Sequence, residues 1–153
     1  MALAARWPEH GDLFAERFTE LAAELEALDA ELEAATAPFA DQYLIFSHPV
    51  YQYLRQRYGL AGSSVHFEPE VVPDAGQWRE LDHLLGHHRA QWMIWEAEPI
   101  EETRRELAER GLGVIVVAPG ATPPAAGDYL HAMRRNIAAL QAAAGPVDSS
   151  PAP

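Results

Sequence analysis

Side chains suited to metal chemistry follow three apolar runs of the sequence. His48 comes just after the run 41–46, His66 and Glu68 lie at the end of the next run, and Glu96 and Glu98 follow the third. Imidazole nitrogens and carboxylate oxygens both bind zinc, and ligands of open α/β sheets sit beyond the carboxyl ends of the strands. The sequence therefore predicts a nitrogen/oxygen metal site at that edge of a sheet. The candidate ligands are His48, His66, Glu96 and Glu98.

Each of these candidates also has a simpler interpretation. Glu96 and Glu98 flank a single alanine, so in extended chain their side chains point the same way. Such a pair can serve acid/base catalysis, coordinate a metal, or place negative charge at the start of the helix expected from Pro99. His48 is either a ligand or only the residue before Pro49 where a strand gives way to a helix. The residues alone leave these alternatives open.

A second group of histidines lies in the stretch LDHLLGHHR. His83 and His87 have the i,i+4 spacing of a metal-binding pair on a helix. Gly86 stands between them and is expected to end the helix, which would separate the two side chains. An incidental, solvated histidine cluster, with His88 as its third member, is therefore the favoured interpretation.

Composition excludes several function classes. The 153 residues include no cysteine, and the 11 basic residues are all arginine, so thiolate sites and lysine chemistry are absent. The net charge of -12 opposes binding to nucleic acid or anionic lipid and favours a cation. No apolar stretch approaches the roughly 20 residues that span a bilayer, so no membrane insertion is expected. A small enzyme using Glu96 and Glu98 is the weakest hypothesis, because no nucleophile elbow or cofactor motif accompanies them.

A long amphipathic helix is expected over residues 9–35. Its apolar seam has alternating spacings of four and three residues. The seam consists of Phe14, Phe18, Leu21, Leu25, Leu28 and Leu32. Acidic residues form a like-charge ridge beside it, which is mildly destabilising for an isolated helix. The favoured interpretation is that the seam packs on the chain's own core; a short coiled-coil seam for a partner is the alternative.

After this helix, strands and helices alternate. Apolar strands are expected near 41–47, 63–67, 91–96 and 113–118. Near-continuous apolar strands separated by helices predict an α/β fold with a four-stranded parallel sheet and helices on both faces. The expected organisation is a long linker helix (1–38), one α/β lobe (39–144) and a flexible tail (145–153).

Several of these motifs resemble one known family. The stretch HPVYQYL at 48–54, continued by RYGL at 57–60, resembles a segment of the zinc/manganese-type (TroA-like) substrate-binding proteins of bacterial ABC transporters. WEAEP at 95–99 resembles the segment after the third strand of their C-terminal lobe, and YLHAM at 129–133 resembles their closing helix. The helix over 9–35 resembles the backbone helix that joins their two lobes. The resemblance covers roughly residues 7 to 142.

The resemblance implies a metal-binding lobe that is incomplete as a transport receptor. Family members hold the metal between two lobes, and this chain matches only the backbone helix and the C-terminal lobe. His48 falls on the family's C-lobe histidine, whereas its usual aspartate falls on Ala118. Glu96, Glu98 or His66 is the expected substitute ligand.

The partners implied are a divalent metal ion, zinc with manganese as the alternative, together with an ABC permease or a missing N-terminal lobe. The family is periplasmic or extracytoplasmic, whereas the chain as written shows no secretory signal and would stay cytoplasmic.

A different class of function is also open. The chain is alternatively a degenerate interaction module that keeps the fold, binds no metal at all and uses its exposed seam and former lobe interface to dimerise or to bind a partner. Loss of a covering lobe would bare apolar surface on the long helix, and such surface tends to be buried by association. The acidic ridge opposes parallel pairing, so a two-fold, antiparallel homodimer through the N-terminal helix is expected.

Overall fold

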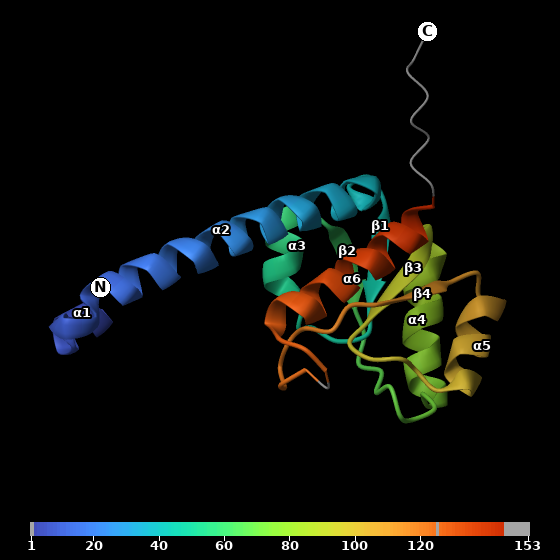
Figure 1. Ribbon diagram of the computed structural model, residues 1–153. Helices are drawn as coiled ribbons and strands as arrows, with labels where there is room; N and C mark the ends of the chain where they lie inside the picture. The colour runs from blue at the N-terminus through green and yellow to red at the C-terminus, as the bar shows by residue number, and fades with distance from the viewer. Residues whose placement is uncertain (1, 125, 146–153) are drawn as a thin grey trace, which may run out of the picture.

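The chain forms a single α/β layer structure with one long projecting helix (Figure 1). The computed structural model describes residues 2–124 and 126–145. The helices are α1 (Ala2–Arg6), α2 (Gly11–Thr36), α3 (Gln52–Tyr58), α4 (Ala75–His87), α5 (Glu101–Glu109) and α6 (Tyr129–Ala144). Short 3-10 turns at Pro8–His10 and Ala37–Phe39 flank α2. The strands are β1 (Tyr43–Phe46), β2 (Ala61–Ser64), β3 (Ala90–Trp95) and β4 (Gly113–Val116).

The four strands make one parallel sheet in the order β2-β1-β3-β4. This confirms the four-stranded parallel sheet expected from the sequence. Because all strands run the same way, the loops that follow them emerge at one edge of the sheet. The chain segments after β1, β2 and β3 therefore become neighbours although they lie far apart in the sequence.

The second strand begins earlier than expected. β2 spans Ala61–Ser64 instead of 63–67, and Gly62 lies opposite Leu44. A Cβ at Gly62 would come within 2.0 Å of the carbonyl oxygen of Leu44, so only glycine fits there. The segment after β2, up to Phe67, still runs alongside the end of β1, because the N–H of Phe67 donates to the carbonyl of Ser47 at 3.0 Å.

Helices cover both faces of the sheet, because successive buried residues of a strand belong in turn to two separate apolar cores. One apolar core joins the sheet to α2, α3 and α6; its strand residues include Leu44, Phe46 and Ile94. The other core joins it to α4 and α5. No helix within the described residues is both long and apolar enough to cross a membrane.

Only the C-terminal half of α2 packs on this core. Leu28 and Leu32 are 3% and 9% exposed. Phe18 and Leu21, by contrast, are 71% and 51% exposed, and Leu25 is 40% exposed. Figure 1 shows the reason: α6 lies against the second half of α2, while the first half extends beyond the sheet and its covering helices, with only α1 beside its start. The expectation that the whole seam packs on the chain's own core is therefore wrong for its first half.

A polar contact fixes α2 on α3. Arg57 donates from Nε to Oδ1 of Asp29 at 3.0 Å, and the Tyr58 hydroxyl donates to the same oxygen at 2.8 Å. The hydrogen bond from Arg57, followed by that from Tyr58, holds the pKa of Asp29 below its usual value. Burial, with a smaller effect of Asp29, raises the pKa of Tyr58 to about 12. The long helix is thus held at both an apolar and a charged contact.

Helix α4 continues past the glycine that was expected to end it. It begins at a capping box, in which the Asp74 side chain accepts hydrogen bonds from the N–H groups of Gly76 and Gln77. Gly86 does not take the left-handed conformation, and the helix runs to His87. The expected end at Gly86 is wrong, because a glycine lowers helix stability only modestly and the packing of α4 outweighs this loss.

The division of the chain at residue 38 stays a prediction. Leu28, Leu32 and Ala35 of α2 share one apolar core with the sheet. The tail expected at 145–153 lies outside the described residues, apart from Gly145.

Candidate metal centre

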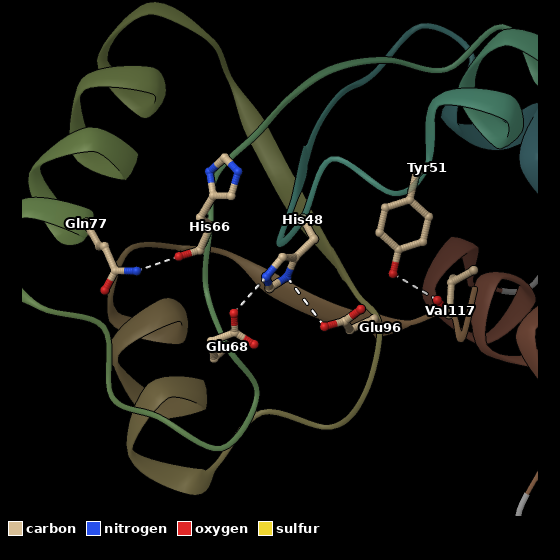
Figure 2. Close-up of polar contacts among 7 residues, drawn as sticks. All are labelled: His48, Tyr51, His66, Glu68, Gln77, Glu96 and Val117. Carbon is tan, nitrogen blue, oxygen red and sulfur yellow. Dashed lines mark hydrogen bonds and ion pairs between the residues drawn. The ribbon is translucent and has the colours of Figure 1, made fainter. Parts of the chain in front are cut away.

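One imidazole and two carboxylate side chains meet at the carboxyl edge of the sheet. His48 follows β1, Glu68 follows β2 and Glu96 follows β3. One ligand atom from each residue lies within 4.8 Å of the others. Figure 2 shows the His48 ring between the two carboxylates. The order of the strands explains this arrangement, because β1 lies between β2 and β3 and delivers its histidine between their loops.

The two ring nitrogens of His48 each face one carboxylate. Nε2 lies 3.2 Å from Oε1 of Glu68, and Nδ1 lies 3.5 Å from Oε1 of Glu96. The second distance is within ion-pair range but too long for a hydrogen bond, so among the described residues the buried Nδ1 has no hydrogen-bond partner. Two ligands of one tetrahedral zinc ion stand roughly 3.3 Å apart, given zinc-to-ligand distances of about 2.0–2.1 Å. Each nitrogen–oxygen pair therefore has about the separation of two ligands of one metal ion, and a single ion would bind one of the two ring nitrogens.

The surroundings suit a bound ion that exchanges with solvent. The side chains of His48, Glu96 and Glu68 are 14%, 28% and 62% exposed, so the group runs from the protein interior to its surface. Glu68 and Glu96 line an open cleft of about 920 Å³, which also contains Ala118 and Tyr129. A hydrated cation can reach the carboxylates through this cleft before it meets the imidazole.

Glu98 does not join the group. Its Oε1 accepts a hydrogen bond at 2.7 Å from Nε of Arg104 on α5. The extended chain on which the pairing of Glu96 with Glu98 depended is absent, because β3 ends at Trp95 and the chain bends at Glu96 instead of continuing as a strand. The result is an exposed ion pair beside the start of α5, in keeping with the interpretation of Glu98 as a helix-end residue.

His66 lies beside the group without entering it. Its ring centroid is 6.1 Å from that of His48, with the two rings edge to face. In Figure 2 its ring points away from Glu68 and Glu96, while its backbone carbonyl accepts a hydrogen bond from the Gln77 side chain. His66 therefore flanks the histidine of the group without offering it a ligand atom.

Glu68 was the member that sequence reasoning placed at the edge but left out of the ligand set. The backbone pairing in the structure explains why Glu68 meets His48. Phe67 donates its N–H to Ser47, so the next residue of one segment, Glu68, falls beside the next residue of the other, His48. Finding this pair from the sequence requires the register of β2 against β1, which the expected strand bounds did not give.

Two buried side chains hold the edge of the sheet around the group. The Tyr51 hydroxyl donates to the carbonyl of Val117 at 2.9 Å (Figure 2). Burial, and to a smaller extent the charge of Glu96, raises the pKa of Tyr51, so the hydroxyl keeps its proton. Asn136 of α6 accepts from the N–H of Ala118 at 3.0 Å and donates to the carbonyl of the same residue at 2.9 Å. The loop after β4 is thus fixed next to the carboxylates, with a methyl group at Ala118.

Comparison with known proteins points to metal-uptake proteins. Residues 1–143 match a family model described as "Zinc-uptake complex component A periplasmic", or ZnuA. The "High-affinity zinc uptake system protein ZnuA" of Brucella abortus (strain 2308) is 31% identical over 75 residues, which are 48% of this chain and 22% of that protein. The match therefore covers about a fifth of the length of that relative (22%).

Solved structures share the fold. The metal-dependent lipoprotein YcdH from Bacillus subtilis superposes with a TM-score of 0.80 at 19% identity, over 92% of this chain and 56% of that one. Zn(II)-bound AdcA from Streptococcus pneumoniae superposes with a TM-score of 0.77 at 20% identity, over 92% of this chain and 32% of that one. At such identities the likeness shows the fold alone.

Proposed function

Because this chain belongs to the ZnuA family of periplasmic zinc-uptake components, we propose that it binds zinc as cargo at the group of His48, Glu68 and Glu96. The observation that carries the proposal is the geometry of His48. A buried imidazole nitrogen without a hydrogen bond faces one carboxylate, and the other ring nitrogen faces a second carboxylate. Metal-binding histidines are commonly oriented by a carboxylate on the nitrogen that does not hold the metal.

The ligand set fits an exchangeable ion better than a permanent one. One ring nitrogen with one or both carboxylates leaves at least one coordination position of tetrahedral zinc to water or to a ligand from outside the described residues. Structural zinc sites, in contrast, are closed by four protein ligands. The imidazole favours zinc over manganese, since manganese prefers oxygen ligands. Delivery of the ion to an ABC permease, in the periplasm, belongs to the same proposal because it follows the family and the names of its relatives.

The test is a zinc titration of the full chain by calorimetry, repeated with manganese. We expect zinc uptake at micromolar concentration, tighter than manganese uptake, and loss of the tightest site in His48→Ala. His10→Ala is the matched control, because that histidine is exposed on the N-terminal segment, away from the sheet. Unchanged zinc affinity in His48→Ala would overturn the site, and no uptake at micromolar zinc by the natural chain would favour the interaction module.

Glutamine variants separate the roles of the two carboxylates. Glu68→Gln and Glu96→Gln each keep an oxygen that can accept a hydrogen bond from the imidazole but remove the anionic ligand. The variant that removes the metal-binding carboxylate should lose more zinc affinity than the variant that removes the carboxylate orienting the ring, whose loss is typically about 10–100-fold. If neither variant alters zinc affinity, the carboxylates have no part in binding.

A second candidate function, dimerisation, has a specific observation in its favour. The first half of α2 carries exposed apolar side chains. These are Leu13, Phe18, Leu21 and Leu25. An acidic ridge lies beside them on the same helix. Its members are Asp12, Glu16, Glu20 and Glu24. We propose antiparallel pairing of two copies here, which separates the ridges. Light scattering at micromolar concentrations should find a dimer that Leu21→Glu dissociates, and a monomer in both chains would exclude it.

A further inference from the structure

Helix α4 brings two histidines together outside the group described above. The helix runs without interruption to His87, so His83 and His87 lie one turn apart on the same face. Their ring centroids are 4.4 Å apart, and both residues are exposed. The objection that Gly86 would separate them no longer holds, because Gly86 is helical.

The separation of the rings matches chelation of one metal ion. A ring nitrogen lies about 2.1 Å from a bound metal, and the ring centroid lies just over an ångström behind that nitrogen. Two imidazoles bound at right angles or at the tetrahedral angle would therefore have centroids roughly 4.5–5.2 Å apart. The observed 4.4 Å is reached from this range by a small rotation about the side-chain bonds.

A backbone contact selects the nitrogen that His87 can offer. Its Nδ1 lies 2.8 Å from the carbonyl oxygen of His83, which can only accept, so Nδ1 carries the proton and donates. The lone pair of the neutral ring is then on Nε2. A backbone carbonyl that fixes the ring of a metal-binding histidine in this way is a common outer-sphere arrangement. Within residues 2–124 and 126–145, no other hydrogen bond engages the ring nitrogens of His83 and His87.

The local charges favour a cation. Both histidines lie in the last two turns of α4, where the partial negative charge of the helix C-terminus stabilises cations. Arg79, one turn before His83, is directed toward the other end of the helix, because its Nη2 lies 3.7 Å from the position that a Cβ would take at Gly76. Asp82 is already paired with Arg110 at 2.9 Å, so the two imidazoles are the ligands considered for this site.

We propose that His83 and His87 form a two-histidine chelating site for a borderline divalent transition metal. Copper(II) binds most tightly, and nickel and zinc bind more weakly, in the usual order for nitrogen ligands. The site lies where α4 ends and β3 begins, at the amino edge of the sheet, whereas His48 lies at the carboxyl edge. The two sites therefore bind separate ions, and neither depends on the other.

The experiment is a copper(II) titration of the full chain carrying His48→Ala, monitored by calorimetry and by electron paramagnetic resonance. His83→Gln and His87→Gln, each added singly, should weaken copper binding at least about tenfold, since losing a ligand costs no less than losing an outer-sphere partner. The resonance spectrum should lose one of two nitrogen couplings in each single variant. Glutamine is a good helix former, so α4 should persist, which circular dichroism checks.

Three outcomes bear on the proposal. His131→Gln, which removes an exposed histidine of α6, should leave copper binding unchanged. Single variants that each remove half the bound copper at unchanged affinity would show two independent histidines and overturn the chelate. Variants within twofold of their parent would also overturn it. Failure of the zinc site at His48 appears separately, as a natural chain whose metal uptake His48→Ala does not change.

Discussion

Two leucines of α2 occupy equivalent positions of the apolar seam in opposite surroundings. Leu28 is 3% exposed in the core shared with α6, whereas Leu21, two turns earlier, is 51% exposed. Replacing either by alanine does not oppose the helix, because alanine is the strongest helix former. The effects of the two substitutions on the free energy of unfolding should therefore differ by their packing alone.

The expected difference follows from burial. Leu28→Ala should lower the free energy of unfolding by about 2–4 kcal/mol, since it combines the transfer free energy of the lost methyl and methylene groups with a cavity. Leu21→Ala removes the same atoms, at about 0.8 kcal/mol per fully buried methylene, from a position half open to water where no cavity forms. Its effect should stay below about 1 kcal/mol.

Urea denaturation followed by circular dichroism, at two protein concentrations, measures both effects. Equal losses in Leu21→Ala and Leu28→Ala, independent of protein concentration, would refute the reasoning from burial. Equal losses that grow with protein concentration would instead indicate that the first half of α2 is buried against a second copy, as the dimer proposal requires.

Two further predictions concern polar contacts. Tyr51→Phe removes the donor to the buried carbonyl of Val117 and should lower the free energy of unfolding by about 1–2 kcal/mol in urea, whereas a change of a few tenths would show that water replaces the hydroxyl. Asp29→Asn should destabilise the chain at neutral pH, because the hydrogen bonds led by Arg57 lower the pKa of Asp29 from its usual 3.8. A lowered pKa stabilises the fold above the unfolded value and loses this effect as the pH falls through the folded one. The gap between Asp29→Asn and the natural chain in urea should therefore close below pH 3.8, and a constant gap would contradict the assignment.

Much of the fold was readable from local pattern. Continuous apolar runs predicted four parallel strands, and β3 and β4 lie within a residue or two of their expected bounds. Such runs report burial directly, because a strand covered on both faces has no polar side. The apolar seam of α2 predicted a helix of nearly the observed length, because the 3.6-residue period of a helix is a local property of the sequence.

The sequence by itself also determined which residue types reach the carboxyl edge of the sheet, since that edge follows from strand direction. It did not determine which of them meet. His48 faces Glu68 because of the register between β1 and the segment after β2, and Glu98 turns to Arg104 because the chain bends after β3. These contacts join residues far apart in sequence, or depend on where a strand ends to within one residue.

The exposed half of α2 and the histidine pair of α4 were likewise decided only by tertiary structure. Periodicity shows that an apolar face exists, whereas burial depends on whether another element lies opposite, and α6 covers only the second half of α2. Gly86 weakens a helix locally, but the packing of α4 on the sheet carries the helix past it to His87. Local propensities amount to about 1 kcal/mol per residue, and the burial of a single leucine outweighs them.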